Sequence, residues 1–155
     1  MTNNKLLLSL AVAATFALSA CDQQSTQADV AEAQQEAQEN VAEARQDAAE
    51  NVAEEREDLR DDMGDRDMNG LDGERADVAD AQAQAQYEVA VAEAEAQHKV
   101  AVEKAQTMPE GPEREAAIAE ADAALEKAKA DAEAARAEAE ANAEQMDENA
   151  DAERM

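Results

Sequence analysis

The chain contains one cysteine, Cys21, whose thiol is the strongest nucleophile that the sequence offers. A single cysteine excludes a disulfide within the chain. Cys21 follows a basic residue, Lys5, and an apolar run over residues 6–17. That run is about a dozen residues long, too short for a helix of roughly 20 residues that spans a bilayer. Residues 1–20 are therefore predicted to be a signal peptide.

The four residues 18–21, Leu-Ser-Ala-Cys, resemble the lipobox of bacterial lipoproteins. The resemblance implies cleavage between Ala20 and Cys21, a diacylglyceryl thioether on the thiol, and acylation of the new amino group by a fatty acid such as palmitate. Several acyl chains, at about 0.8 kcal/mol per buried methylene, anchor a protein stably in a membrane. Asp22 and Gln23 resemble the enteric sorting signal, which favours the inner over the outer membrane. The alternative is an ordinary secretory signal with a chance cysteine.

Oxygen-bearing side chains alternate along residues 65–70 (DRDMNG) before a glycine. This spacing matches the opening of a calcium loop between two helices, as in an EF-hand, because Ca²⁺ takes six to eight oxygen ligands. The candidate ligands are Asp65, Asp67, Asn69 and Asp72. At the twelfth position of the 65–77 loop, however, the expected bidentate glutamate is Ala76. The alternative is a flexible acidic turn whose glycines end a helix.

Catalytic arrangements are not recognisable in the sequence. No nucleophile has a base beside it, and no glycine-rich phosphate loop is present. A chain without a globular core also offers no closed cleft in which pKa values could be shifted. His98, the only histidine, cannot form a metal site alone, and Tyr87 is interpreted as a packing residue. We therefore predict a protein that is not an enzyme and that needs no cofactor, unless the acidic loop binds Ca²⁺.

The charge is strongly acidic, with 39 Asp and Glu against 13 Lys and Arg and a formal net charge of -26. Such a chain repels nucleic acids and anionic surfaces, so no nucleic-acid partner is expected. The hydrophobic content of 45% is mostly alanine, which cannot form a globular core and leaves part of the chain disordered. Alanine, Glu and Gln favour helix. The predicted fold is all-α: long alanine-rich amphipathic helices in a coiled-coil-like hairpin or three-helix arrangement.

An 11-residue repeat recurs along residues 30–62 and again along residues 78–110. Three consecutive repeats begin with valine: residues 30–40 (VAEAQQEAQEN), 41–51 (VAEARQDAAEN) and 52–62 (VAEEREDLRDD). Apolar residues occupy positions 1, 4 and 8 of each repeat, with Glu55 as the exception. Eleven residues in three turns is 3.67 per turn, so the apolar stripe runs nearly straight along a helix. The same period returns from Val78, Val89 and Val100.

The last block changes to a seven-residue period typical of coiled coils. Its seam consists of Ile118, Leu125, Ala132, Ala139 and Met146, with Ala121, Ala128 and Ala135 three residues after the first three. Because its twist differs from that of the earlier repeats, we expect this helix to pack loosely. Asn142 and Asn149 enter the seam, so we expect the end to fray.

Glycines and prolines divide the chain into predicted segments. They are the lipidated Cys with a polar tether (21–28), a first helix (29–62), a Gly/Asp-rich loop (63–74), a second helix (75–108), a turn (109–112), a third helix (113–148) and a tail (149–155). Each helix would be about 50 Å long at 1.5 Å per residue. Short connections predict antiparallel neighbours.

A lipid anchor followed by a helical rod resembles the murein lipoprotein of the Gram-negative envelope. That family ends in a lysine joined to peptidoglycan, whereas residues 153–155 here are Glu-Arg-Met, so this link is not implied. Separately, VAEARQDAAEN resembles the repeats of group 3 late-embryogenesis-abundant proteins, which become helical on drying or at surfaces. We expect a membrane-anchored, periplasmic structural or scaffold lipoprotein of the cell envelope that self-associates or binds an envelope protein. The alternatives are a stress-protective polyanion and a calcium-responsive module using the 65–77 loop.

Overall fold

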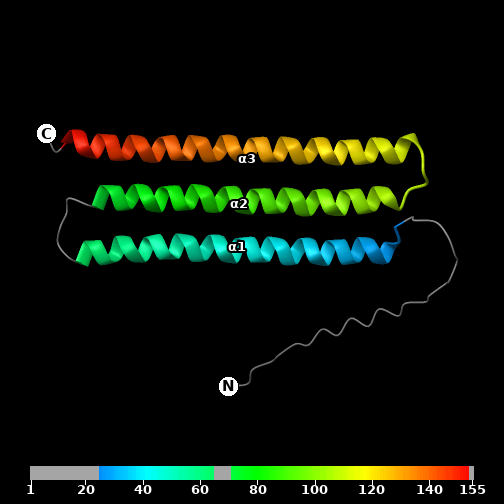
Figure 1. The fold of residues 1–155 in the computed structure, drawn as a ribbon, viewed down its shortest axis with the longest axis horizontal. Coiled ribbons are helices and arrows are strands. Elements are labelled where there is room, and N and C mark those ends of the chain that lie inside the picture. The colour runs from blue at the N-terminus through cyan, green and yellow to red at the C-terminus, as the bar shows by residue number, and fades with distance from the viewer. Residues whose placement is uncertain (1–24, 65–70, 154–155) are drawn as a thin grey trace, which may run out of the picture.

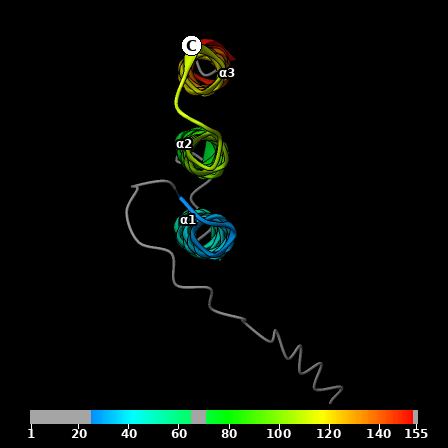
Figure 2. The same cartoon turned by 90° about the vertical axis from the view of Figure 1, so that its right-hand side faces the viewer.

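The computed structural model describes residues 25–64 and 71–153. They form three long α-helices: α1 (Gln27–Gly64), α2 (Leu71–Gln106) and α3 (Pro112–Glu153). The helices run antiparallel and side by side (Figure 1), and the view at right angles shows their axes in one row (Figure 2). The predicted all-α fold with a three-helix arrangement is confirmed, and the described residues contain no strand.

The central helix α2 packs against both of its neighbours, whereas α1 and α3 do not contact each other in the described part of the chain. The molecule is therefore a layer one helix thick rather than a closed bundle. α1 and α3 each have one flank covered by a neighbour, and α2 has two. Both flat sides of the layer lack a covering element among the described residues. Every side chain that points out of the plane must therefore suit water or a partner.

The seam of α1 against α2 follows the 11-residue repeat. The buried and partly buried residues of α1 are Val30, Ala33, Ala37, Val41, Ala44, Ala48, Val52, Glu55 and Leu59. They occupy positions 1, 4 and 8 of each repeat, because three turns per eleven residues bring these positions onto one straight side of the helix. Glu55, which interrupts the apolar pattern, still lies in the seam.

The predicted seven-residue seam of α3 is wrong at Ala135 and Asn142, whereas Ala139 is partly buried as predicted. The most buried residues of this helix are Ala121, Ala132 and Ala143, which are spaced by eleven, while Ala135 and Asn142 are exposed. A seam repeating every seven residues needs a left-handed supercoil, whereas the eleven-residue seam of α2 runs nearly straight. α3 follows its neighbour, and it packs along α2 as extensively as α1 does instead of packing loosely.

The ends of α3 and α2 also differ from the predicted bounds. α3 continues to Glu153, through residues 149–153 that the sequence predicts to be a frayed tail. An asparagine costs a helix only a few tenths of a kcal/mol relative to alanine, so two of them do not end an alanine- and glutamate-rich helix. α2 begins at Leu71 and includes Gly73, because about 1 kcal/mol for one glycine is outweighed by the residues that follow.

α1 begins at Gln27, inside the predicted tether, because Thr26 and Asp29 cap its first turn. The Thr26 backbone N–H donates to the Asp29 carboxylate at 2.6 Å, and the Asp29 backbone N–H donates to the Thr26 hydroxyl at 3.4 Å. This reciprocal arrangement satisfies two backbone donors at the helix start. The hydrogen bonds from Thr26 hold the pKa of the Asp29 carboxyl below its usual value. The Ser25 hydroxyl donates to the Gln106 side chain at 3.0 Å and ties this end of α1 to the end of α2.

The turn between α2 and α3 is closed by local hydrogen bonds. The Thr107 hydroxyl donates to the Lys104 carbonyl at 2.7 Å, and the Met108 N–H donates to the Ala105 carbonyl at 3.0 Å. Gly111 has φ of 156°, which L side chains rarely adopt. Pro112 then starts α3, where a missing N–H costs nothing, and two glutamates in the first turn suit the helix dipole.

Candidate functional site

The residues of the predicted lipid anchor lie outside the described part of the chain. They are Ala20, Cys21, Asp22 and Gln23. Signal cleavage, lipidation and membrane sorting therefore stay predictions. None of the three described helices holds a stretch that is long and apolar enough to cross a bilayer.

The predicted calcium ligands are likewise not placed. Asp65, Asp67 and Asn69 lie outside the described residues, and of Asp72 only the backbone, in the first turn of α2, is described. Within 25–64 and 71–153, no three His, Cys, Asp or Glu side chains are arranged to hold a metal ion. The calcium loop stays a prediction. Titration calorimetry tests it: heat from Ca²⁺ that disappears with Asp65→Ala plus Asp67→Ala supports it, and no heat with the wild type rejects it.

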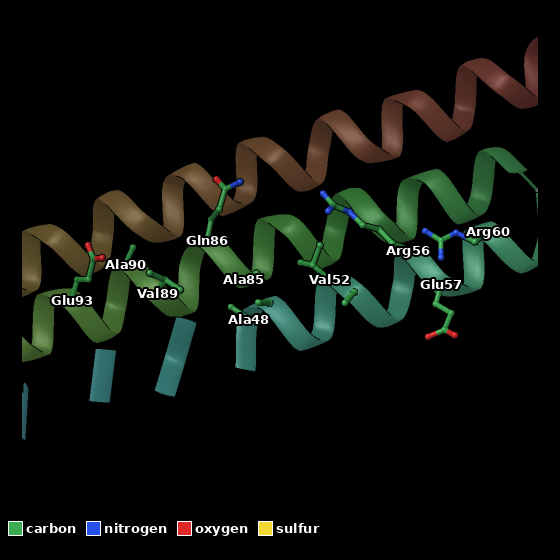
Figure 3. Close-up of a pocket in the computed structure, with 12 residues that line it drawn as sticks. Ala48, Val52, Arg56, Glu57, Arg60, Ala85, Gln86, Val89, Ala90 and Glu93 are labelled. Carbon is green, nitrogen blue, oxygen red and sulfur yellow. The ribbon is translucent and has the colours of Figure 1, made fainter. Parts of the chain in front are cut away.

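Two grooves lie end to end between α1 and α2, with volumes of about 860 and 750 Å³. Figure 3 shows the first, in which Val52 and Val89 line the groove from the two helices. Val41 and Val100 line the second, and Glu93 borders both. These walls are mostly alanine and valine side chains from the repeats.

A third, smaller groove of about 170 Å³ lies between α2 and α3. It shares Gln97 and Ala101 with the second groove, so all three grooves open on the same flat side of the layer. We call this side the groove face and define it by the residues that line the three grooves. On α3 it includes Ala124, Leu125 and Ala128.

The cations of α1 are concentrated on the groove face. Arg45, Arg56 and Arg60, the only basic residues of α1, all line the two large grooves. Arg45 pairs with Glu93 across the groove at 2.6 Å. Arg56 and Arg60 make no ion pair with another described residue. The arginines occupy positions 5 and 9 of the repeat, on one side of the seam.

The opposite flat side of α1 carries acids at positions 3 and 7 of each repeat: Glu32, Glu36, Glu43, Asp47, Glu54 and Asp58. We call this side of the layer the acidic face. On α2 the two faces are separated in the same way, since Gln84 lines a hollow of the acidic face and Gln86 lines a groove. Two residues along a helix correspond to about 200° of rotation. The second and third repeats therefore place their arginines on the groove face and the acids of positions 3 and 7 on the opposite face, while Glu57 is an acid that lines a groove.

The acidic hollow has a volume of about 520 Å³ and receives residues from all three helices. Its carboxylates are Glu55, Asp77, Asp80, Glu140 and Glu144. Burial raises the pKa of Asp80 above its usual value, and the negative charges of Glu140, Asp77 and Glu144 raise it further. These carboxylates repel one another, so the hollow is a place where the layer is destabilised at neutral pH.

Salt bridges across the seams join the helices of the layer. Lys99 of α2 pairs with Glu36 of α1, and Lys129 of α3 pairs with Glu95 of α2 at 2.8 Å. The Lys129 side chain is largely exposed, and its hydrogen bond to Glu95 raises its pKa. Exposed pairs of this kind contribute about 0–1 kcal/mol each, so they set the register of the helices more than the stability of the layer.

Between α2 and α3, two polar contacts complete the seam. His98 is partly buried, with Nε2 at 2.7 Å from the Asp122 carboxylate. The Arg136 guanidinium lies 4.7 Å from the centroid of the Tyr87 ring and pairs with Glu140 at 3.1 Å. The contacts of Arg136 with Tyr87 and Glu140 are not expected from the sequence, because the seven-residue period places Ala135 rather than Arg136 in the seam.

Comparisons with protein-family models, with curated proteins and with solved structures give no match for this chain.

Proposed function

We propose that this protein is a structural lipoprotein of the bacterial cell envelope, anchored to a membrane through Cys21 and facing the periplasm. The observation that carries the proposal is the sequence Leu-Ser-Ala-Cys at residues 18–21, behind a basic residue and an apolar run of signal-peptide length. Acyl chains on Cys21 would hold the chain at a membrane, and the three-helix layer begins only a few residues later, at Gln27.

The role is that of a spacer or scaffold. A helix of 36–42 residues is about 55–65 Å long at 1.5 Å per residue, so the layer can extend a binding surface far from its anchor. The grooves are open and shallow and their walls are mostly alanine and valine, which suits contact with another protein surface better than the enclosure of a small molecule. The acidic face keeps the layer away from anionic lipid headgroups.

The anchor is tested by labelling cells that express the full chain with radioactive palmitate. We expect label in the wild type and none in Cys21→Ser, because only the thiol at this position accepts the lipid. A matched control, Ser19→Ala, keeps a small residue before the cleavage site and should retain the label. Unlabelled wild type would reject the lipoprotein proposal.

Sorting is a separate step of the proposal and is tested by fractionation. With Asp22 next to the lipidated cysteine, we expect the chain in the inner membrane of an enteric host, and Asp22→Ser should move it to the outer membrane. Gln23→Ser serves as the control and should leave the distribution less changed. An outer-membrane wild type would contradict the assignment of Asp22 as a retention signal.

Circular dichroism distinguishes the scaffold from the alternative of a stress-protective polyanion. A scaffold should be strongly helical in dilute buffer and should melt cooperatively, because its helices are held by the seams. A protectant should give a coil spectrum that becomes helical only in dehydrating solvent. The second result would reject the scaffold role.

A further inference from the structure

We propose that the groove face is a dimerisation surface, on which a second copy of this chain packs face to face to form a two-layer, six-helix assembly. The twofold axis would run parallel to the helices, between the two layers and above α2. In this arrangement α2 faces α2 of the second copy, and α1 faces α3 of the second copy. This inference goes beyond the proposed envelope function and does not depend on the lipid anchor.

The first argument is the incomplete burial of the largest seam side chains. Val41, Val52, Val89 and Val100 are only partly buried, and they line open grooves. The buried side chains, by contrast, are alanines apart from Val78. Protein domains bury their apolar faces between at least two packed layers, and the described residues supply only one.

The groove face is also large enough for a stable dimer. α2 has 36 residues and is about 54 Å long. Three helices with axes about 8–10 Å apart give a face roughly 25 Å wide. The available area is therefore on the order of 1,000 Å² per copy, compared with about 800 Å² per partner in a standard interface.

The second argument is charge. On α1 the groove face carries Arg45 and Arg56. On α3 it carries two acids and one base: Asp131 and Glu138 follow the groove residue Ala124 at intervals of seven, which is nearly two full turns, and Asp131 pairs with Lys127. Both acids are exposed. The face is therefore basic over α1 and acidic over α3, and a rotation that exchanges these two helices brings opposite charges together.

The charges also lie at matching heights along the layer. Arg45 pairs with Glu93, and nearby Glu95 pairs with Lys129, so positions 45 and 129–131 are level. Glu55 lines one hollow with Glu140 and Glu144, so position 56 is level with about position 142. Rotation about a twofold axis parallel to the helices leaves the position of each residue along the helix axes unchanged. It would place Arg45 opposite Asp131, and Arg56 opposite Asn142 and about one helical turn from Glu138 of the second copy, a separation that the two long side chains can span.

The middle of the interface is compatible with close approach. The groove residues of α2 include the small Ala90 and Ala101 and the neutral Gln86 and Gln97, while Lys104 lies toward one end of the face. Glu93 would approach its own copy, but its charge is compensated by Arg45 at 2.6 Å. Small residues in a helix seam permit near contact between backbones, so α2 can pack on α2 without steric conflict.

The experiment is disulfide crosslinking of the full chain in the cells that express it, with Arg45→Cys and Asp131→Cys in one chain. α1 and α3 do not contact each other, so these two cysteines cannot join within one layer. We expect a dimer on a non-reducing gel that is lost on reduction. Arg56→Cys plus Asn142→Cys should give the same dimer, because Asn142 is level with Arg56 and lies five turns after the groove residue Ala124. All four side chains are exposed, so the substitutions should not disturb folding.

Three controls separate this geometry from others. The unmutated chain measures any dimer formed through Cys21. Glu43→Cys plus Glu133→Cys places cysteines on the same two helices but on the acidic face, and it should not crosslink above that level. Arg45→Cys alone should also stay monomeric. Crosslinking by Arg45→Cys alone would indicate that α1 packs against α1 of the second copy. Crosslinking by the acidic-face pair would indicate nonspecific stacking. Either result would overturn the proposal.

Charge exchange at positions 56 and 138 tests the electrostatic contact, with the disulfide between positions 45 and 131 as the readout. In the chain with cysteines at 45 and 131, Arg56→Glu should reduce the dimer, because it brings two acids together across the interface. Adding Glu138→Arg should restore it. These two residues lie on helices that do not touch, so rescue must act between chains. Failure of the double exchange to restore the dimer, or no dimer in either cysteine pair, would reject the pairing. Palmitate labelling would be unaffected by that result.

Discussion

The seam between α1 and α2 differs from the seam between α2 and α3, although both repeat every eleven residues. The first contains the valines that begin each repeat, and grooves of about 860 and 750 Å³ remain along it. The second is lined by Ala83, Ala94 and Ala105 of α2 and by Ala121, Ala132 and Ala143 of α3, and its groove has about 170 Å³. Alanine permits close approach of two helices, whereas valine holds the helix axes farther apart, and the valine side chains stay partly exposed in the grooves.

The largest effect is expected from a bulky residue in the alanine seam. Ala132→Leu should destabilise the layer by about 1–3 kcal/mol, because the close approach of α2 and α3 leaves no room for the added carbons. Urea unfolding followed by circular dichroism measures the loss. The control is Ala49→Leu, which adds the same carbons at an exposed position beside a groove and should change stability little. Equal losses would mean that the two seams do not differ in tightness.

A smaller effect is expected at the polar contact of the alanine seam. Arg136→Ala removes the contact with the Tyr87 ring and the pair with Glu140, and should cost about 1 kcal/mol. Arg45→Ala removes an exposed pair across the valine seam and should cost less. Thermal melting of the two variants compares them. A greater loss for Arg45→Ala would show that the valine seam is the one that depends on its polar contact.

Within the valine seam, Val52→Ala should have a net effect below about 1 kcal/mol. The lost apolar contact of a partly buried valine is offset in part by the higher helix propensity of alanine, about half a kcal/mol. Val78→Ala, at a residue only 8% exposed, should cost more. Chemical unfolding distinguishes them. A loss at Val52 as large as that at Val78 would contradict the open character of the groove.

The smallest effect is expected at the acidic hollow, which is lined by residues of all three helices. The raised pKa of Asp80 means that the folded chain retains a proton at a pH where the unfolded chain has lost it. The stability of the layer therefore decreases as pH rises from the unfolded pKa through the folded pKa, and it stays lower at neutral pH. Asp80→Asn should raise the melting temperature slightly at pH 7 and have no such effect near pH 3. The control, Asp58→Asn, lies outside the hollow; an equal rise there would assign the effect to net charge.

Much of the fold follows from residue type and spacing. The alanine- and glutamate-rich composition predicts helix, and the valine repeat predicts the α1 seam, including the position of Glu55. Pro109, Gly111 and Pro112 predict the second turn. α1 begins earlier than predicted because Thr26 and Asp29 cap its first turn with reciprocal hydrogen bonds.

Of the candidate site, the sequence indicates the anchor and the acidic loop, which lie at residues that the structure does not describe. It does not indicate the groove face, although the signal is present: arginine occurs only at positions 5 and 9 of the α1 repeat, and acids recur at positions 3 and 7. Which side of α1 becomes the open face depends on where α2 and α3 lie. The charge pattern alone therefore does not show which side stays uncovered.

From its sequence alone, then, this protein has three long helices, a straight alanine and valine seam on α1 and a strong segregation of charge around that helix. Those properties are local, because helix propensity and a repeat of three turns per eleven residues act within a single helix. The period of the α3 seam, the role of Arg136 and the separation of the layer into a groove face and an acidic face were decided by packing. An alanine-rich helix has several sides nearly equal in apolarity, and only contact with a neighbour selects the one that is buried.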